Sequence, residues 1–172
     1  ENTIVMFTTD HGEMAGSHKL IAKTTFYEES SKIPLIIRYP KEIKQSITNS
    51  DALVSTIDIM PTLLDLAGVE IPKGIDGRSF KKQILESEVS TNEFDIVFSQ
   101  NQFGRMVRYD QFKYVRSVVY GITYEILYDI DNDPNESKNL IDDPKFKNQL
   151  TKGRKLLDDW LVNEGTKLIV ER

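Results

Sequence analysis

The apolar positions in the first half of the chain form two short unbroken runs and one helical stripe. Residues 3–9 (TIVMFTT) and 34–39 (PLIIRY) show no polar alternation, which is typical of strands buried on both faces, as in a parallel sheet. Residues 24–31 fit one or two helical turns. The helix should end before Pro34, because a proline forces the residue before it out of the helical region. Residues 58–67 have apolar side chains at helical spacing and precede Gly68, which predicts a left-handed cap. The order strand, helix, strand, helix predicts an α/β layer.

The second half changes to short strand patterns separated by turns. These segments predict a small antiparallel sheet: residues 94–99, 105–109, 113–118 and 124–128. From Pro144 onward, apolar residues recur at helical spacing among lysines and aspartates: Phe146, Leu150, Leu157, Trp160 and Leu161. This spacing predicts an amphipathic helix packed on the sheet. We therefore expect an α/β part over residues 1–90 and a small α+β subdomain over residues 91–172.

Composition removes several classes of function. The 172 residues carry 22 Lys and Arg against 27 Asp and Glu, a net charge of -5, and so lack the basic stripe that nucleic acid or an anionic membrane requires. No apolar run approaches the roughly 20 residues that span a bilayer. The chain has no cysteine, which excludes disulfides, thiolate metal sites and a cysteine nucleophile within it. Because it opens within an apparent strand, we expect a fragment whose N-terminal portion is missing.

Candidate chemistry follows the first predicted strand directly. Residues 8–13 (TTDHGE) place the carboxylate of Asp10 beside the imidazole of His11, and Gly12 permits a close turn beneath them. Ligands of open α/β sheets bind beyond the carboxyl ends of strands, so both side chains could reach one divalent cation. The alternative for these residues alone is an Asp turn followed by an exposed histidine.

The motifs that follow resemble those of a known family. Their segments are residues 16–30 (GSHKLIAKTTFYEES), 33–40 (IPLIIRYP), 58–68 (DIMPTLLDLAG), 76–80 (DGRSF) and 127–140 (LYDIDNDPNESKNL). In this order and spacing they resemble the C-terminal half of the sulfatases, within the alkaline-phosphatase-like superfamily. The resemblance implies an α/β fold: the C-terminal part of an alkaline-phosphatase-like sandwich, followed by a small antiparallel sheet with a packed C-terminal helix.

The resemblance also implies roles for three side chains. Asp10 and His11 match ligands of a divalent metal, usually calcium, and Lys23 matches the lysine that contacts the sulfate ester. A cation and a fixed ammonium would stabilise the charge that develops on the ester oxygens. His18, eight residues after Asp10 in the same loop, is a candidate for contacting substrate or protonating the leaving alcohol, although a lone histidine favours a structural role and Lys19 stands where the family often has glycine.

The family's nucleophile has no counterpart in this sequence. It is a formylglycine made from Cys or Ser in a Cys/Ser-x-Pro-x-Arg motif, which we expect in the missing N-terminal part of the same fold. The isolated chain should therefore be inactive, while the parent should cleave a sulfated small molecule or glycan. Phosphonate monoester hydrolases and phosphodiesterases of the same superfamily share the pattern and remain alternatives, as does a non-catalytic binding module. A periplasmic or secreted location is also implied by the resemblance alone.

Two acidic segments invite other interpretations. Glu28 and Glu29 could form an acid/base pair, but their place between a lysine-bearing loop and a buried strand favours structural groups. Residues 129–140 imitate the start of an EF-hand loop, yet Pro134 occupies the position that needs glycine. We interpret this acidic stretch as a solvated turn.

Overall fold

The computed structural model describes residues 2–43, 48, 52–85 and 95–163. The chain divides into two compact units, of which the first comprises Glu1–Asp10 and Ile33–Asp95 and the second comprises His11–Lys32 and Ile96–Arg172. Residues 11–32, which the sequence pattern groups with the α/β part, thus belong to the same unit as the C-terminal sheet. The expected boundary near residue 90 lies outside the described residues.

The described strands of the first unit form a short antiparallel ribbon. β1 (Val5–Phe7) pairs with β2 (Ile36–Arg38). Val5, Phe7 and Ile36 leave 50%, 60% and 62% of their surface exposed. The predicted parallel arrangement is therefore wrong for this pair, whose strands run antiparallel and are partly exposed in this chain. A continuous apolar run makes a strand hydrophobic on both faces, but it encodes neither the direction of its neighbour nor what covers it.

Helices α2 (Ile59–Ala67) and α3 (Lys81–Leu85) belong to the same unit. The 3-10 turn η2 (Thr56–Asp58) leads into α2, and the carboxylate of Asp58 closes a capping box there. α2 ends at Gly68, whose φ of 72° is left-handed. Both the helix and its glycine cap are confirmed as the sequence predicts them.

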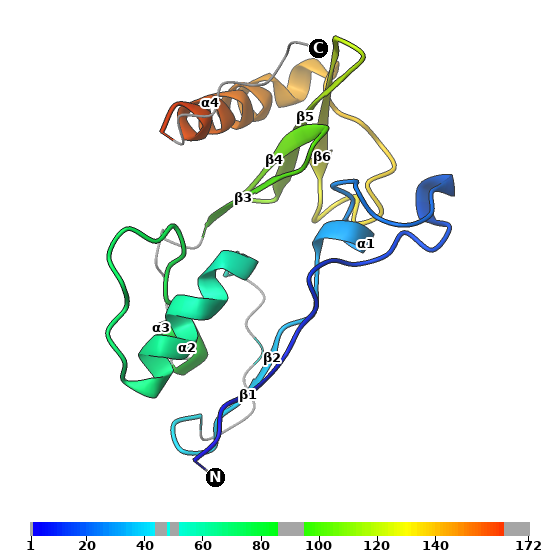
Figure 1. The fold of residues 1–172 in the computed structure, drawn as a ribbon. Coiled ribbons are helices and arrows are strands. Elements are labelled where there is room, and N and C mark those ends of the chain that lie inside the picture. Colours follow the sequence, from blue (N-terminus) through cyan, green and yellow to red (C-terminus); the bar gives the residue numbers. More distant parts are fainter. Residues whose placement is uncertain (1, 44–47, 49–51, 86–94, 164–172) are drawn as a thin grey trace. The chain divides into compact units, whose positions relative to one another are not determined.

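The described part of the second unit is built on a four-stranded antiparallel sheet (Figure 1). The strands neighbour one another in chain order: β3 (Ile96–Gln100), β4 (Gly104–Tyr109), β5 (Phe112–Val119) and β6 (Ile122–Asp129). The turn between β5 and β6 consists of Tyr120 and Gly121, whose φ angles of 50° and 75° match the twist of a tight hairpin. The predicted antiparallel sheet is confirmed.

Helix α4 (Lys147–Asn163) covers one face of this sheet and follows the 3-10 turn η4 (Pro144–Phe146). The shared core contains side chains from both elements: Val107, Tyr109, Phe112, Tyr114, Leu127, Leu150, Leu157 and Leu161. Gly153 lets the helix approach closely, because a Cβ there would lie 2.7 Å from the Tyr109 hydroxyl. The amphipathic C-terminal helix is thus confirmed, and no helix among the described residues is both long and apolar enough to cross a membrane.

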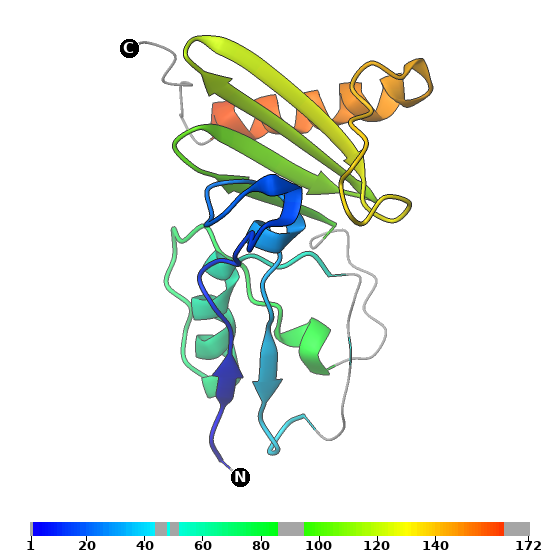
Figure 2. The same cartoon turned by 90° about the vertical axis from the view of Figure 1, so that its right-hand side faces the viewer.

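The opposite face of the sheet is partly covered by the N-terminal segment of the same unit (Figure 2). This segment contains η1 (Ser17–Lys19) and the short helix α1 (Glu28–Ser31). The ring of Phe26 packs against Met106 and Val115, which face away from α4. The sheet therefore has α4 on one face and the stretch that carries the predicted site on the other.

Candidate active site

The loop between His11 and α1 has an unusual backbone. Left-handed φ angles occur at non-glycine residues along it: Ala15, His18, Lys19, Ala22 and Thr24. Such angles are costly for residues with a Cβ and persist where the surrounding structure imposes them, often at functional sites. Two backbone hydrogen bonds cross the loop, from Met14 N to Ala22 O and from Gly16 N to Leu20 O, both at 2.9 Å. The loop is therefore a specifically folded element.

The structure brings together two of the residues that the sequence singles out. Lys23 Nζ contacts His11 Nε2, although the two residues are twelve positions apart along the chain. His11 Nδ1 lies 2.7 Å from the carbonyl oxygen of Gly12, an arrangement in which Nδ1 carries the proton and donates. Nε2 then presents its lone pair on the side of the ring where Lys23 lies. The amine of Lys23 and the imidazole of His11 are thus held in one small polar cluster.

Asp10 is the last residue of the first unit, and its Oδ1 accepts a hydrogen bond from Thr9 Oγ1 at 3.3 Å. Together with His11 it supplies one oxygen and one nitrogen donor, whereas calcium takes six to eight oxygen ligands. Among the described residues, no three carboxylate or imidazole side chains gather into a metal site. The pair therefore fits part of a ligand set. The hydrogen bond from His11 Nδ1 to a backbone carbonyl is typical of metal-binding histidines, which agrees with that partial fit.

His18 is packed against its neighbours. Its ring stacks on Tyr27 with the centroids 3.7 Å apart and the planes 12° apart. Nε2 lies 3.9 Å from Glu29 Oε1. These contacts give the ring a structural function, and they leave the role of His18 toward a substrate a prediction.

Gly12 joins the start of the loop to α1. Its amide donates to Ser30 O at 2.9 Å. A Cβ at this position would lie 1.9 Å from Glu29 O, so only glycine permits the approach. Because Gly12 packs against α1, its neighbour His11 is held close to this helix.

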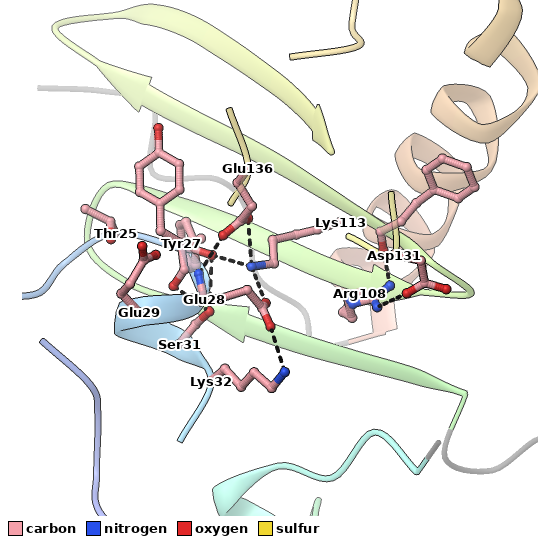
Figure 3. Close-up of polar contacts among 12 residues, drawn as sticks. Thr25, Tyr27, Glu28, Glu29, Ser31, Lys32, Arg108, Lys113, Asp131 and Glu136 are labelled. Carbon is pink, nitrogen blue, oxygen red and sulfur yellow. Dashed lines mark hydrogen bonds and ion pairs between the residues drawn. The ribbon is translucent and has the colours of Figure 1, made fainter. Parts of the chain in front are cut away.

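A buried ion network lies on the other side of α1 (Figure 3). Lys113 Nζ, on β5, is 2.5 Å from Glu28 Oε1 and 2.9 Å from Glu136 Oε1. It also donates to Phe26 O at 2.8 Å. Burial raises the pKa of Glu136, while the neighbouring Lys113 opposes this change. Glu28 thus has a structural partner, in line with the interpretation preferred from sequence.

Sequence reasoning missed Lys113 and Glu136. The expectation of a solvated acidic turn is wrong for Glu136, which is only 2% exposed. Lys113 is 1% exposed and stands in a strand otherwise rich in apolar and aromatic residues. A lysine at an inward position of a buried strand is the signal that could have identified the network, because lysine is rarely fully buried without a partner.

Comparison with known proteins identifies relatives of this chain. Residues 16–161 match the model of the family described as N-sulphoglucosamine sulphohydrolase, C-terminal. The chain is 38% identical over 169 residues to an uncharacterized sulfatase, YidJ, of Escherichia coli, covering 94% of this chain and 32% of that protein. It is 35% identical over 171 residues to a delta 4,5-hexuronate-2-O-sulfatase of Bacteroides thetaiotaomicron, covering 94% of this chain and 35% of that protein. The chain therefore spans about a third of the length of these curated relatives.

Solved structures show the same fold. A 2-O GAG sulfatase superposes with a TM-score of 0.80 at 37% identity, covering 94% of this chain and 36% of that one. A protein solved in complex with its substrate D-glucosamine-2-N,6-O-disulfate gives 0.79 at 26% identity, with 99% and 36% covered. A phosphonate monoester hydrolase of Silicibacter pomeroyi gives 0.76 at 27% identity, with 94% and 35% covered. The fold is thus shared with hydrolases of more than one ester class.

Proposed function

Because this chain belongs to the sulfatase family, we propose that it forms the C-terminal portion of an enzyme that hydrolyses sulfate esters to an alcohol and sulfate. The observation that supports this most directly is the contact between Lys23 and His11. It brings the predicted sulfate-binding group next to a predicted metal ligand. The family match over residues 16–161 includes Lys23 but not His11, and it assigns a role to neither, so those roles remain the content of the proposal.

In this proposal Lys23 binds a peripheral oxygen of the sulfate group. Its ammonium is held by the folded loop before the ester arrives, so little reorganisation is needed as the charge on the sulfate oxygens changes in the transition state. Asp10 and His11 would hold a divalent metal, calcium by family resemblance, together with ligands from outside this chain; Nε2 of His11, which contacts Lys23 here, would then bind the metal and Lys23 the sulfate. The metal, when bound, supplies further positive charge against the ester oxygens.

The remaining catalytic groups are proposed to lie in a preceding portion of the same fold. That portion would supply the formylglycine nucleophile and the other metal ligands. The exposed apolar residues Val5, Phe7 and Ile36 on the β1–β2 ribbon support such a partner, since single strands seldom leave this much apolar surface uncovered. On family resemblance we place the parent enzyme in the periplasm or outside the cell.

Sulfated glycans are the proposed substrate class. The support is that one relative is a hexuronate-2-O-sulfatase and that a similar structure was solved with a disulfated glucosamine. Phosphonate monoesters are the second candidate, because a phosphonate monoester hydrolase shares the fold at a TM-score of 0.76. Both substrate classes place a tetrahedral, anionic centre where an ammonium and a cation can stabilise it.

The full-length, metal-loaded protein tests the proposal. We expect kcat/KM for a sulfated monosaccharide or an aryl sulfate to exceed that for a matched phosphonate monoester. Lys23→Ala should lower kcat/KM by about 10²–10³ while leaving the melting temperature nearly unchanged, because Lys23 is exposed. The control is Lys155→Ala, which removes a lysine whose side chain is 74% exposed on α4 and should change neither quantity.

The outcomes separate the candidates. Cleavage of the phosphonate alone would favour the second candidate. A protein that cleaves neither ester would be a non-catalytic module. Normal turnover by the Lys23 variant would remove that residue from the site.

A further inference from the structure

Helix α1 lies between the candidate site and the sheet of the second unit. On the site side, Ser30 O accepts the hydrogen bond from Gly12, the neighbour of His11. The ring of Tyr27, just before α1, stacks on His18. Lys23 precedes α1 by five residues. The positions of the loop's functional side chains therefore depend on where α1 sits.

On the sheet side, α1 is held by hydrogen bonds and ion pairs rather than by apolar contact alone (Figure 3). Lys113 Nζ reaches the carboxylate of Glu28 at 2.5 Å and the carbonyl of Phe26 at 2.8 Å. Glu136 Oε2 accepts a hydrogen bond from the Glu28 amide at 2.6 Å. The same pair of residues thus contacts the side chain of Glu28, its backbone amide and the carbonyl of Phe26, two residues before the helix.

The pair also binds within itself. Lys113 Nζ lies 2.9 Å from Glu136 Oε1, an ion pair that adds to the ion pair with Glu28 and the hydrogen bond to Phe26 O. The two hydrogen bonds, from Lys113 Nζ to Phe26 O and from Glu28 N to Glu136 Oε2, are directional and constrain the position of α1. Further toward the loop, Asn101 Nδ2 donates to Thr24 O at 3.0 Å, next to Lys23.

Stability alone does not account for this arrangement. Lys113 and Glu136 are 1% and 2% exposed, and both charges lose their hydration there. Replacing a buried ion pair by well-packed apolar residues is often neutral or stabilising. What apolar residues do not provide is directional hydrogen bonds at the start of one short helix, such as those to Phe26 O and from Glu28 N.

We propose that Lys113 and Glu136 are positioning residues of the site: they fix α1 on the sheet and thereby hold Lys23 and His11 together. They do not touch the substrate and act only through α1 and its loop. The inference rests on the proposed function in so far as Lys23 binds the sulfate group. The placement of α1 by the pair can be measured separately.

The test compares three variants of the full-length, metal-loaded protein. Lys113→Met removes the ammonium but leaves Glu136 buried and unpaired, so this variant could lose its fold. Lys113→Met with Glu136→Gln leaves no buried charge in the pair. The remaining carboxylate of Glu28 is not left buried and unpaired, because its side chain is 21% exposed and lies 3.8 Å from Lys32 Nζ. Arg116→Met is the matched control, because it removes a cation from the same strand that points to α4, where it binds Asp158 at 2.7 Å.

For the double variant we expect kcat on an aryl sulfate to fall about 10- to 100-fold, with KM changing less, because a displacement near 1 Å can cost that much in rate. The amides of residues 24–32 should exchange with solvent at least tenfold faster. Arg116→Met should retain kcat within about threefold, whatever its melting temperature. Unchanged exchange in the double variant, or an equal loss of kcat in the Arg116 control, would overturn the inference.

The two proposals fail in different ways. If the wild-type protein cleaves no sulfate ester, or if Lys23→Ala leaves kcat/KM unchanged, the proposed function fails. The exchange measurement still decides whether Lys113 and Glu136 hold α1. If the wild type is active and depends on Lys23, but the double variant keeps normal kcat, only the positioning role fails.

Discussion

Replacing Gly153 by alanine should loosen α4 from the sheet. In an exposed helix this change stabilises by about 1 kcal/mol, because glycine is the poorer helix former. Here the added Cβ would lie 2.7 Å from the Tyr109 hydroxyl and 2.9 Å from the Cβ of Tyr114. The second atom is attached directly to the backbone of β5 and cannot rotate away.

The cost of this overlap exceeds the gain in helix propensity. Overpacking a close contact costs typically about 1–3 kcal/mol. If the Tyr109 ring moves aside, its hydrogen bond to Gln149 O, 2.7 Å long, is also lost, at a further cost of about 1 kcal/mol. We therefore expect a net destabilisation of about 2 kcal/mol in Gly153→Ala.

Native-state hydrogen exchange of the α4 amides measures this value as a drop in their opening free energy. Lys155→Ala, at an exposed position of the same helix, should shift it by less than about 0.5 kcal/mol. Combining Gly153→Ala with Tyr109→Phe should cost less than the two changes added, since the Phe ring lacks the oxygen nearest the new methyl group. An opening free energy that stays constant or rises in Gly153→Ala would refute the reasoning.

Two further predictions concern pH and the isolated chain. Hydrogen bonds from Arg154 lower the pKa of Glu125 below its ordinary value, so the pair stabilises the fold at pH values above that ordinary pKa, and this contribution disappears as the pH falls through the lowered pKa. Arg154→Met should therefore flatten the acid side of the melting-temperature profile, and an unchanged slope would contradict the assignment. The isolated chain should bind calcium more weakly than micromolar and show no turnover of an aryl sulfate, because Asp10 and His11 are only part of a ligand set. Calorimetry measures the affinity. Micromolar binding that is lost in Asp10→Ala would show that the chain forms a complete site.

Features that depend on local periodicity could be predicted from the sequence. The apolar spacing over residues 58–67 and the glycine after it are enough to specify α2 and its left-handed cap. Alternating strands with a Tyr120–Gly121 turn between two of them specify an antiparallel sheet, and the spacing from Pro144 specifies α4. In each case the information lies within a few residues, because helix and strand periods and turn angles are local properties.

The candidate site was only partly predictable. His11 and Lys23 were identified by motif, and the structure places them in contact. The same motif gave no indication that Gly12 packs on the backbone of α1 or that His18 stacks on Tyr27. Those contacts arise from the folded path of the loop. Its left-handed φ angles occur at residues whose intrinsic backbone preferences do not favour them.

Only the tertiary structure decided which distant residues meet. The backbone amide of Glu28 donates to the carboxylate of Glu136, 108 positions away, and Lys113 Nζ donates to the carbonyl of Phe26, 87 positions away. The antiparallel pairing of β1 with β2 could likewise not be predicted, because the same hydrophobic pattern is compatible with parallel and with antiparallel pairing. Burial turned an apparently solvated glutamate into one part of an ion network, because desolvation and partner geometry depend on the whole fold and not on neighbours in the sequence.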